Sequence, residues 1–146
     1  MFIEGIIIVM DLDEFEEYTL VHGYDQYKPN IVTGTLTRLV EELSTKYRAV
    51  IIYGHDPARG TEEAVIEIPL MSDGQIRDLL NDLERVKQEI NKLGARITIV
   101  VIRDYVYPRP ARNRREAYSG TPGRKRALKL LRKAKRSGGN RIVVEI

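Results

Sequence analysis

Residues 2–15 of the chain, FIEGIIIVMDLDEF, decide its fold. The apolar run from Ile6 to Met10 is mostly β-branched, which is typical of a short strand that is buried on both faces. The run stops at two carboxylates, Asp11 and Asp13. Charge at the end of a buried strand is costly unless a partner neutralises it, and Mg²⁺ is often held by one or two carboxylates plus substrate phosphates. The alternative is that both acids are solvated or cap the following turn.

Composition limits the class of protein. With 146 residues, the chain is expected to form a single domain over 1–146. No apolar segment is long enough to span a membrane and Met1 does not begin a signal-peptide pattern, so we expect a cytoplasmic protein without membrane contacts. The chain has no cysteine and two histidines, so a metal site would use oxygen ligands, which suits Mg²⁺ or Mn²⁺. A charged fraction of 31% without Cys or Trp fits a thermophile.

Charge is distributed unevenly along the chain. Residues 103–141 contain 14 basic and 2 acidic residues, a net charge of +12, so the remainder carries −9 to give the overall +3. Basic clusters attract phosphates on nucleotides, nucleic acids or membranes, although a basic helix face can also serve only solubility. The sequence therefore joins an acidic body to a strongly basic C-terminal third.

Hydrophobic periodicity predicts three helices and five strands. Helices are expected at 33–47, from Ser72 or Asp73 to 93, and at 122–136; strands are expected at the first apolar run and at 48–55, 61–69, 96–107 and 140–146. The segments 16–30 and 108–115 are expected to be loops. The first six elements form a split βαββαβ, or ferredoxin-like, order. We therefore predict an α+β fold, with an antiparallel sheet, helices packed mainly on one face and an added C-terminal αβ unit.

Three stretches resemble a known family. VMDLDEF at 9–15 resembles the first strand of GGDEF (diguanylate cyclase) domains, and YGHD at 53–56 lies where that family has Tyr-Gly-Gly-Asp-Glu-Phe. AKRSGGNR at 134–141 is similar to the family's closing Ala-Lys-x-x-Gly-Arg-Asn-Arg. Together they resemble the palm domain shared by nucleotidyl cyclases of the GGDEF type and by archaeal GTP cyclohydrolase III.

The resemblance implies a role for each matching residue. Asp11 and Asp56 would be the catalytic, metal-binding carboxylates, and Asp13 would either support these ligands from beside the metal or bind a second metal. Lys135 would contact the terminal phosphates of GTP or ATP. The sequence differs from the family at His55, Pro57 and Gly139, where the family has glycine, an acid and arginine. Asp56 before a proline is also a common turn former, which is the alternative interpretation.

The expected helix at 122–136 offers further phosphate ligands. Its N-terminus has free backbone N–H groups and a positive dipole end, and Arg124 and Lys125 lie in its first turn. With Lys135, they are our candidate phosphate ligands, complementary to the acidic body.

Three functions fit these observations. The first is a Mg²⁺-dependent enzyme that cyclises or joins purine nucleoside triphosphates, or hydrolyses the GTP ring. The second is a catalytically silent sensor of a nucleotide or cyclic nucleotide. The third is an RNA-binding module that uses the basic third, with Tyr105, Tyr107 and Tyr118 stacking on bases. Because diguanylate cyclases act across two domains, the resemblance also implies a homo-oligomer, a dimer or larger.

Overall fold

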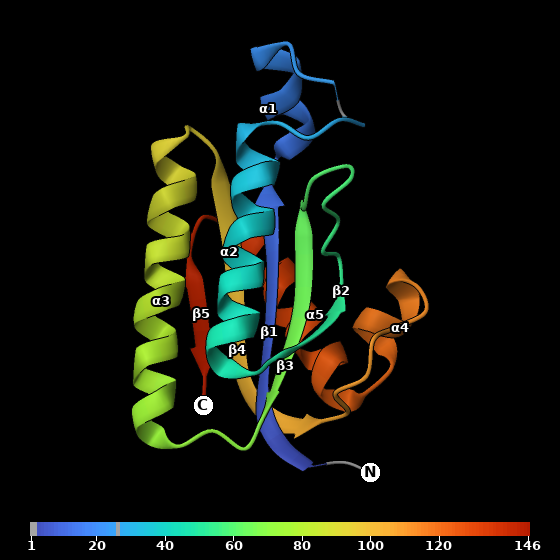
Figure 1. The fold of residues 1–146 in the computed structure, drawn as a ribbon, viewed down its shortest axis with the longest axis vertical. Helices are drawn as coiled ribbons and strands as arrows, with labels where there is room; N and C mark the ends of the chain where they lie inside the picture. The colour runs from blue at the N-terminus through green and yellow to red at the C-terminus, as the bar shows by residue number, and fades with distance from the viewer. Residues whose placement is uncertain (1–2, 26) are drawn as a thin grey trace.

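A five-stranded sheet forms the centre of the computed structural model, which describes residues 3–25 and 27–146 (Figure 1). The strands lie in the order β2 (Val50–Tyr53), β3 (Glu63–Pro69), β1 (Ile3–Asp13), β4 (Arg96–Val106) and β5 (Ile142–Glu145). The first four strands in this order pair antiparallel, and β5 is parallel to β4. The predicted α+β class and ferredoxin-like strand order are confirmed.

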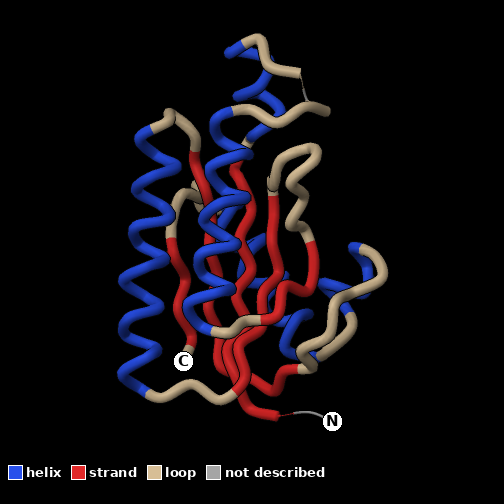
Figure 2. The backbone as a smooth tube through the Cα atoms, viewed as in Figure 1, coloured by secondary structure: helices blue, strands red, loops and turns tan. Residues whose placement is uncertain are grey.

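Helices cover both faces of this sheet (Figure 1, Figure 2). The helices are α1 (Phe15–His22), α2 (Ile31–Tyr47), α3 (Asp73–Lys92), α4 (Arg114–Ser119) and α5 (Pro122–Arg136). The core helices α2 and α3 share the front face of Figure 1, as expected for a βαββαβ unit. The added α5, with α4 beside it, covers the back face. We call these the front face and the back face below.

The double covering explains the apolar run that opens the sequence. Side chains alternate across a strand, so Ile6 and Ile8 belong to the front core, whereas Ile7 and Val9 belong to the back core. All four are at most 1% exposed. Asp11 and Asp13 continue the odd-numbered row and therefore lie on the back face, at the end of β1 where the back core stops.

Most helix ends follow their sequence signals. Ser72 and Gln75 form a capping box at the start of α3, and Thr121 accepts a hydrogen bond from the Arg124 backbone N–H at the start of α5. Helix α2 begins earlier than expected, because Asn30 rather than Thr33 is its N-cap. Thr33 instead closes the capping box by accepting from the Asn30 N–H.

Two short helices were not predicted: α1 lies almost wholly in the expected loop 16–30, and α4 begins in the expected loop 108–115 and continues to Ser119. Helix α1 buries only Phe15 and Thr19, while its apolar residues Leu20 and Val21 are exposed, so its apolar residues do not follow a helical period. Helix α4 is six residues long and is capped by the Asn113 side chain. The hairpin strands β2 and β3 are also shorter than expected, with a register irregularity between Ile51 and Tyr53.

Long-range pairing fixes the centre of the sheet. Strand β1 pairs with β4 along its whole length, from Ile3 opposite Val106 to Asp13 opposite Arg96. Strand β1 also pairs with β3, which sets Asp11 opposite Glu63. None of the helices in the described part of the chain is both long and apolar enough to cross a membrane.

Candidate functional site

The end of β1 gathers polar residues from three strands. Asp11 lies opposite Glu63 of β3 on one side and opposite Thr98 of β4 on the other. Residues in register on adjacent strands share a face, so all three belong to the back face of the sheet. The last turn of α5 brings Lys135 to the same place. We call Asp11, Asp13, Glu63 and Lys135 the β1-end site.

Asp13 is fully hydrogen-bonded within the protein. Its Oδ1 accepts from Thr98 Oγ1 at 2.7 Å and from Lys135 Nζ at 2.8 Å, and its Oδ2 accepts from the Asn140 backbone N–H at 2.7 Å. The residue is 8% exposed. These bonds attach the end of α5 and the start of β5 to β1, so we do not include Asp13 among the proposed metal ligands.

Gly139 allows this close contact. Its φ is +63°, and a Cβ at this position would lie 2.8 Å from Asp13 Oδ2. A side chain would therefore be strained and would also displace the carboxylate. Gly139 stands where the resembled family has arginine, and here its lack of a side chain lets the backbone approach Asp13.

Lys135 is shared between several acceptors. Its Nζ donates to Asp13 Oδ1 and, at 3.2 Å, to the Leu12 carbonyl, and lies 3.8 Å from Asp11 Oδ1. The structure thus brings together three of the predicted site residues, Asp11, Asp13 and Lys135. One ammonium group faces two carboxylates, which leaves negative charge in excess.

Asp11 is the less compensated of the two acids. Its side chain is 26% exposed, and it accepts no hydrogen bond from residues 3–25 and 27–146. Burial raises the pKa of Asp11 to about 7, against the lowering effect of Lys135 and with a further increase from Glu63. The Asp11 carboxyl therefore changes protonation near neutral pH, and a nearby cation would favour its ionised form.

Glu63 was not identified from the sequence. Its Oε1 accepts from the Tyr118 hydroxyl at 2.6 Å and from Arg114 Nε at 3.1 Å, and the Arg114 guanidinium lies 4.9 Å from the Tyr118 ring centroid. Burial raises the pKa of Tyr118 well above its ordinary value, so the hydroxyl stays a donor. The available signal was the ferredoxin-like strand order, which pairs β3 with β1 and so brings the first residue of β3 to the end of β1.

Asp56 lies in the hairpin loop rather than beside Asp11. Its Oδ1 accepts from the backbone N–H groups of Ala58 and Arg59 at 3.1 and 3.0 Å, which is the turn-forming alternative. It lines a pocket of about 360 Å³ with seven other residues: Tyr53, Gly54, His55, Arg59, Gly60, Glu62 and Glu63. Glu63 thus belongs both to this hairpin pocket and to the β1-end site.

His55 is held by the front face. Its Nε2 lies 2.9 Å from Glu41 Oε1 of α2, so the imidazole contacts the helix that packs beside the hairpin. This contact gives His55 a structural partner on α2.

Arg124 does not have the position that a phosphate ligand needs. It is 2% exposed, and its Nε and Nη2 donate to the two Glu67 oxygens at 3.0 and 3.2 Å. Further donors reach the carbonyls of Tyr107 and Glu116. Because Glu67 is itself 0% exposed, Arg124 neutralises a buried carboxylate, and we correct its predicted phosphate-binding role to a structural one.

Lys125 lies far from Lys135. Ten helical residues separate them, or about 15 Å along the axis. Gly123, in the first turn of α5, packs against Ile7 and Asp104, towards the other end of β1 from Asp11. The N-terminus of α5 and Lys125 therefore do not belong to the β1-end site.

Metal-binding capacity is limited to a few ligands. The described residues contain no group of three or more acidic or histidine side chains that could hold a metal by themselves. Asp11 and Glu63 nevertheless offer adjacent carboxylate oxygens, the donor type that Mg²⁺ and Mn²⁺ prefer. These residues fit a cation whose remaining ligands come from water and from a bound phosphate.

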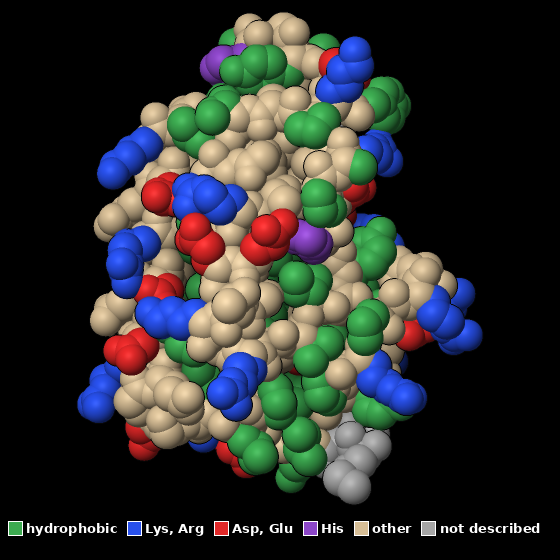
Figure 3. All heavy atoms as spheres, in the orientation of Figure 1, with side chains coloured by type: hydrophobic (Ala, Val, Ile, Leu, Met, Phe, Trp, Pro, Cys, Tyr) green, Lys and Arg blue, Asp and Glu red, His purple; other side chains and the backbone are tan. Residues whose placement is uncertain are grey.

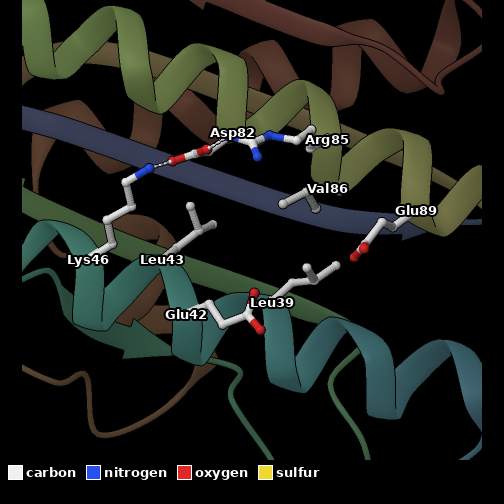
Figure 4. A pocket seen from close by; sticks show the side chains of 8 residues that line it. All are labelled: Leu39, Glu42, Leu43, Lys46, Asp82, Arg85, Val86 and Glu89. Atoms are coloured by element: carbon white, nitrogen blue, oxygen red, sulfur yellow. Dashed lines mark hydrogen bonds and ion pairs between the residues drawn. The ribbon is translucent and has the colours of Figure 1, made fainter.

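The front face offers a contrasting pocket. Lys or Arg and Asp or Glu side chains alternate over α2 and α3 (Figure 3), where Leu39, Leu43 and Val86 line a groove of about 270 Å³. Asp82 crosses it and pairs with Lys46 at 2.7 Å and with Arg85 (Figure 4). The charges at this groove compensate one another, so it is a helix contact rather than a candidate site.

Comparisons with known proteins add no family. No protein-family model matches the chain, and a search of curated proteins found no match. The relation to palm-domain nucleotidyl cyclases therefore stays a prediction from the sequence motifs.

Proposed function

We propose that this chain binds a purine nucleoside triphosphate, GTP or ATP, with Mg²⁺ or Mn²⁺ at the β1-end site. One observation carries the proposal: the Asp11 carboxylate is three-quarters buried beside Glu63, with one shared lysine 3.8 Å away and no hydrogen bond from the described residues. The protein alone compensates such a carboxylate poorly. A divalent cation would compensate it and would also bind phosphate.

Each residue of the site has a role in this proposal. Asp11 and Glu63 hold the cation, which neutralises charge on the phosphates when bound. Glu63 is positioned by Tyr118 and Arg114 through Oε1, while its Oε2 has only a 3.4 Å contact with Arg114. Lys135 has three N–H donors, and Asp13 and the Leu12 carbonyl take two of them. The third is available to a phosphate oxygen.

The hairpin pocket is the proposed place of the nucleoside. Its volume of about 360 Å³ lies within the range of small-molecule sites, and it shares Glu63 with the β1-end site. Gly54 and Gly60, at φ +99° and +93°, let the loop pack closely, since a Cβ at either position would clash with Glu63 O or with Thr33 Oγ1, respectively. Tyr53 lines the same pocket and offers a ring for contact with a base.

Turnover and binding without turnover are the two forms of this function. Nucleotidyl transfer needs mainly positioning and charge neutralisation, and Asp11, with a pKa of about 7, can exchange a proton near neutral pH. Sensing without turnover is favoured by a different observation. Asp56, the second predicted catalytic carboxylate, uses its Oδ1 to hold its own turn.

The test uses purified protein with GTP or ATP and Mg²⁺ or Mn²⁺. We expect the nucleotide to raise the melting temperature by about 5 °C or more at saturating concentration, only when the metal is present. Mass spectrometry of the same mixtures distinguishes the two forms, because turnover gives a cyclic, linked or ring-opened nucleotide and sensing gives none.

Asp11→Asn is the decisive variant. For each protein, the shift is measured from the melting temperature of that same protein without nucleotide. Asp11→Asn should lose the metal-dependent shift and any product. Asp78→Asn is the matched control, since Asp78 is an exposed acid on α3 of the front face, and it should behave as the wild type does. A metal-dependent shift that survives Asp11→Asn would show that the nucleotide binds elsewhere.

A further inference from the structure

The outward side of α5 carries a stripe of cations. We define the α5 stripe as five exposed residues: Lys125, Lys129, Arg132, Lys133 and Arg136. At 100° per residue these side chains fall within an arc of about 100°, and they extend over about 16 Å of helix. The opposite side of α5, with Ala127, Leu131 and Ala134, is buried against the back face of the sheet.

The cations of the stripe have no acidic partners. Within residues 3–25 and 27–146, none of the five makes an ion pair or a side-chain hydrogen bond. The neighbouring Arg126, at the border of the stripe, does find partners: it donates to the Arg103 carbonyl at 3.0 Å and lies 3.7 Å from Asp104. Uncompensated like charges at this density create a positive potential that attracts a polyanion.

We propose that the α5 stripe binds the phosphate backbone of double-stranded RNA. The proposal does not depend on the nucleotide site, because Lys135, the only α5 residue of that site, lies outside the stripe. The five side chains of the stripe are all Lys or Arg, which bind phosphate oxygens by charge, and residues 122–136 contain no Asn or Gln that would pair with adenine edges.

A membrane surface does not fit the same helix. Amphipathic helices that bind lipid insert their apolar side into the acyl region. In α5 that side is occupied, because Ala127 and Leu131 are at most 3% exposed against the sheet. The stripe can therefore offer charge to a membrane but no apolar anchor.

A single strand fits less well than a duplex. Proteins that bind single strands without sequence preference combine cations with aromatic rings on which the bases stack. Residues 122–136 contain no aromatic residue, and Tyr118 of the preceding helix is 2% exposed and donates to Glu63. The predicted stacking role of Tyr118 is therefore corrected. Tyr105, which is 62% exposed, lies on β4 in the alternate row that faces the front.

The embedding of α5 favours RNA over DNA. A recognition helix reads DNA by entering its major groove, which is about 12 Å wide. Helix α5 exposes only one arc, since its other side packs on β1 and β4 and α4 lies beside it. A convex ridge of cations can instead lie across a groove and contact its borders. The narrow major groove of A-form RNA brings its two phosphate rows close enough for such a ridge.

The test is fluorescence anisotropy with a labelled RNA duplex of about 20 base pairs, repeated at several salt concentrations. Five phosphate contacts predict a slope of log affinity against log salt of about −4.5. The triple variant K129Q/R132Q/K133Q should make the slope shallower by about three units and should weaken the affinity by about tenfold or more. The single variant Arg132→Gln should make the slope shallower by about one unit.

The matched control removes the same charge from the front face. The triple variant R77Q/K87Q/K92Q, on α3, should bind within about twofold of the wild type. Equal losses in both triple variants would show that net charge, and not the stripe, governs binding. Tighter binding to DNA duplex of the same length, to single-stranded RNA or to anionic vesicles would overturn the choice of RNA duplex. Asp11→Asn should leave RNA binding intact, which separates this result from the nucleotide test.

Discussion

The two ends of α5 meet the sheet through different charge arrangements. At its beginning, one arginine faces one carboxylate: Arg124 donates twice to Glu67, and both side chains are at most 2% exposed. At the end of the helix, one lysine faces two carboxylates: Lys135 lies 2.8 Å from Asp13 and 3.8 Å from Asp11. In the first arrangement the charges compensate each other without a ligand, whereas in the second the negative charge of Asp11 is not fully compensated. The count of donors for each carboxylate, more than its burial, therefore separates a structural acid from a candidate ligand.

The largest expected effect comes from removing the Arg124–Glu67 ion pair at the beginning of α5. Arg124→Met should lower the free energy of unfolding by about 3–5 kcal/mol, because it leaves the Glu67 carboxylate buried without its partner. Urea denaturation followed by circular dichroism measures this loss. The double variant Arg124→Met with Glu67→Leu should recover most of the stability, because the buried charge is removed as well.

The matched control is on the same helix. Arg126→Met removes an exposed arginine whose carboxylate partner is 3.7 Å away, and should change stability by less than about 0.5 kcal/mol. A similarly small effect of Arg124→Met would mean that the Arg124–Glu67 pair is not a structural clamp.

The second effect concerns Asp11, at the other end of α5, and depends on pH. The pKa of Asp11 is raised from 3.8 to about 7 by burial, so the folded protein keeps a proton that the unfolded chain releases. The contribution of the Asp11 carboxyl to the free energy of unfolding is fully present below about pH 4 and is lost as pH rises to about 7. Asp11→Asn should remove this loss and make the variant more stable than the wild type by roughly 2–4 kcal/mol at pH 8.

Denaturation curves of both proteins at several pH values measure this difference. The two stabilities should converge towards low pH, and Asp78→Asn should follow the wild type throughout. A constant difference at every pH would argue against a titrating Asp11. In the presence of Mg²⁺ the wild type should recover part of the deficit at pH 8, since a bound cation favours the ionised carboxylate.

The smallest expected effect is a difference in stability between two glycine variants, and it tests the contact that holds the end of α5. Gly139→Ala adds a Cβ 2.8 Å from Asp13 Oδ2 at φ +63°, whereas Gly23→Ala, at φ +70°, meets no atom within 4 Å. Both variants should suffer the strain of a left-handed backbone, about 1–2 kcal/mol. Gly139→Ala should lose about 1–2 kcal/mol more, measured by thermal unfolding, and equal losses would deny the close approach to Asp13.

Much of the fold followed from local patterns. The run of residues 6–10 predicted a doubly buried strand, and the Ser72 and Thr121 caps marked the beginnings of α3 and α5. Gly94 follows the end of α3 with a φ of +82°, the left-handed conformation that glycine commonly adopts after a helix. The helix α1 was missed because its stability comes from a few contacts, such as the Tyr18 hydroxyl with the Leu93 carbonyl, and not from a periodic apolar face.

The candidate site was less predictable because it depends on pairs that are distant in sequence. Arg124 appeared in a run of basic residues, and only its partner Glu67, an acid between apolar residues in the middle of strand β3, suggested a buried pair. Glu63 became visible through its register with Asp11. Lys135, predicted as a phosphate ligand, lies beside Asp11 and Asp13, at the opposite end of the helix from Lys125.

The pairing of β1 with β4 has a consequence for synthesis of the chain. Strand β1 is synthesised before the other strands of this sheet, yet its partner along its whole length spans residues 96–106. Until then the aliphatic residues of β1 have only part of their cover, and contacts of such sequence separation form slowly. Until residues 96–106 are synthesised, the nascent chain therefore carries a partly uncovered aliphatic segment of the kind that is prone to aggregate. We expect a dependence on chaperones during expression that the stability of the finished protein would not reveal.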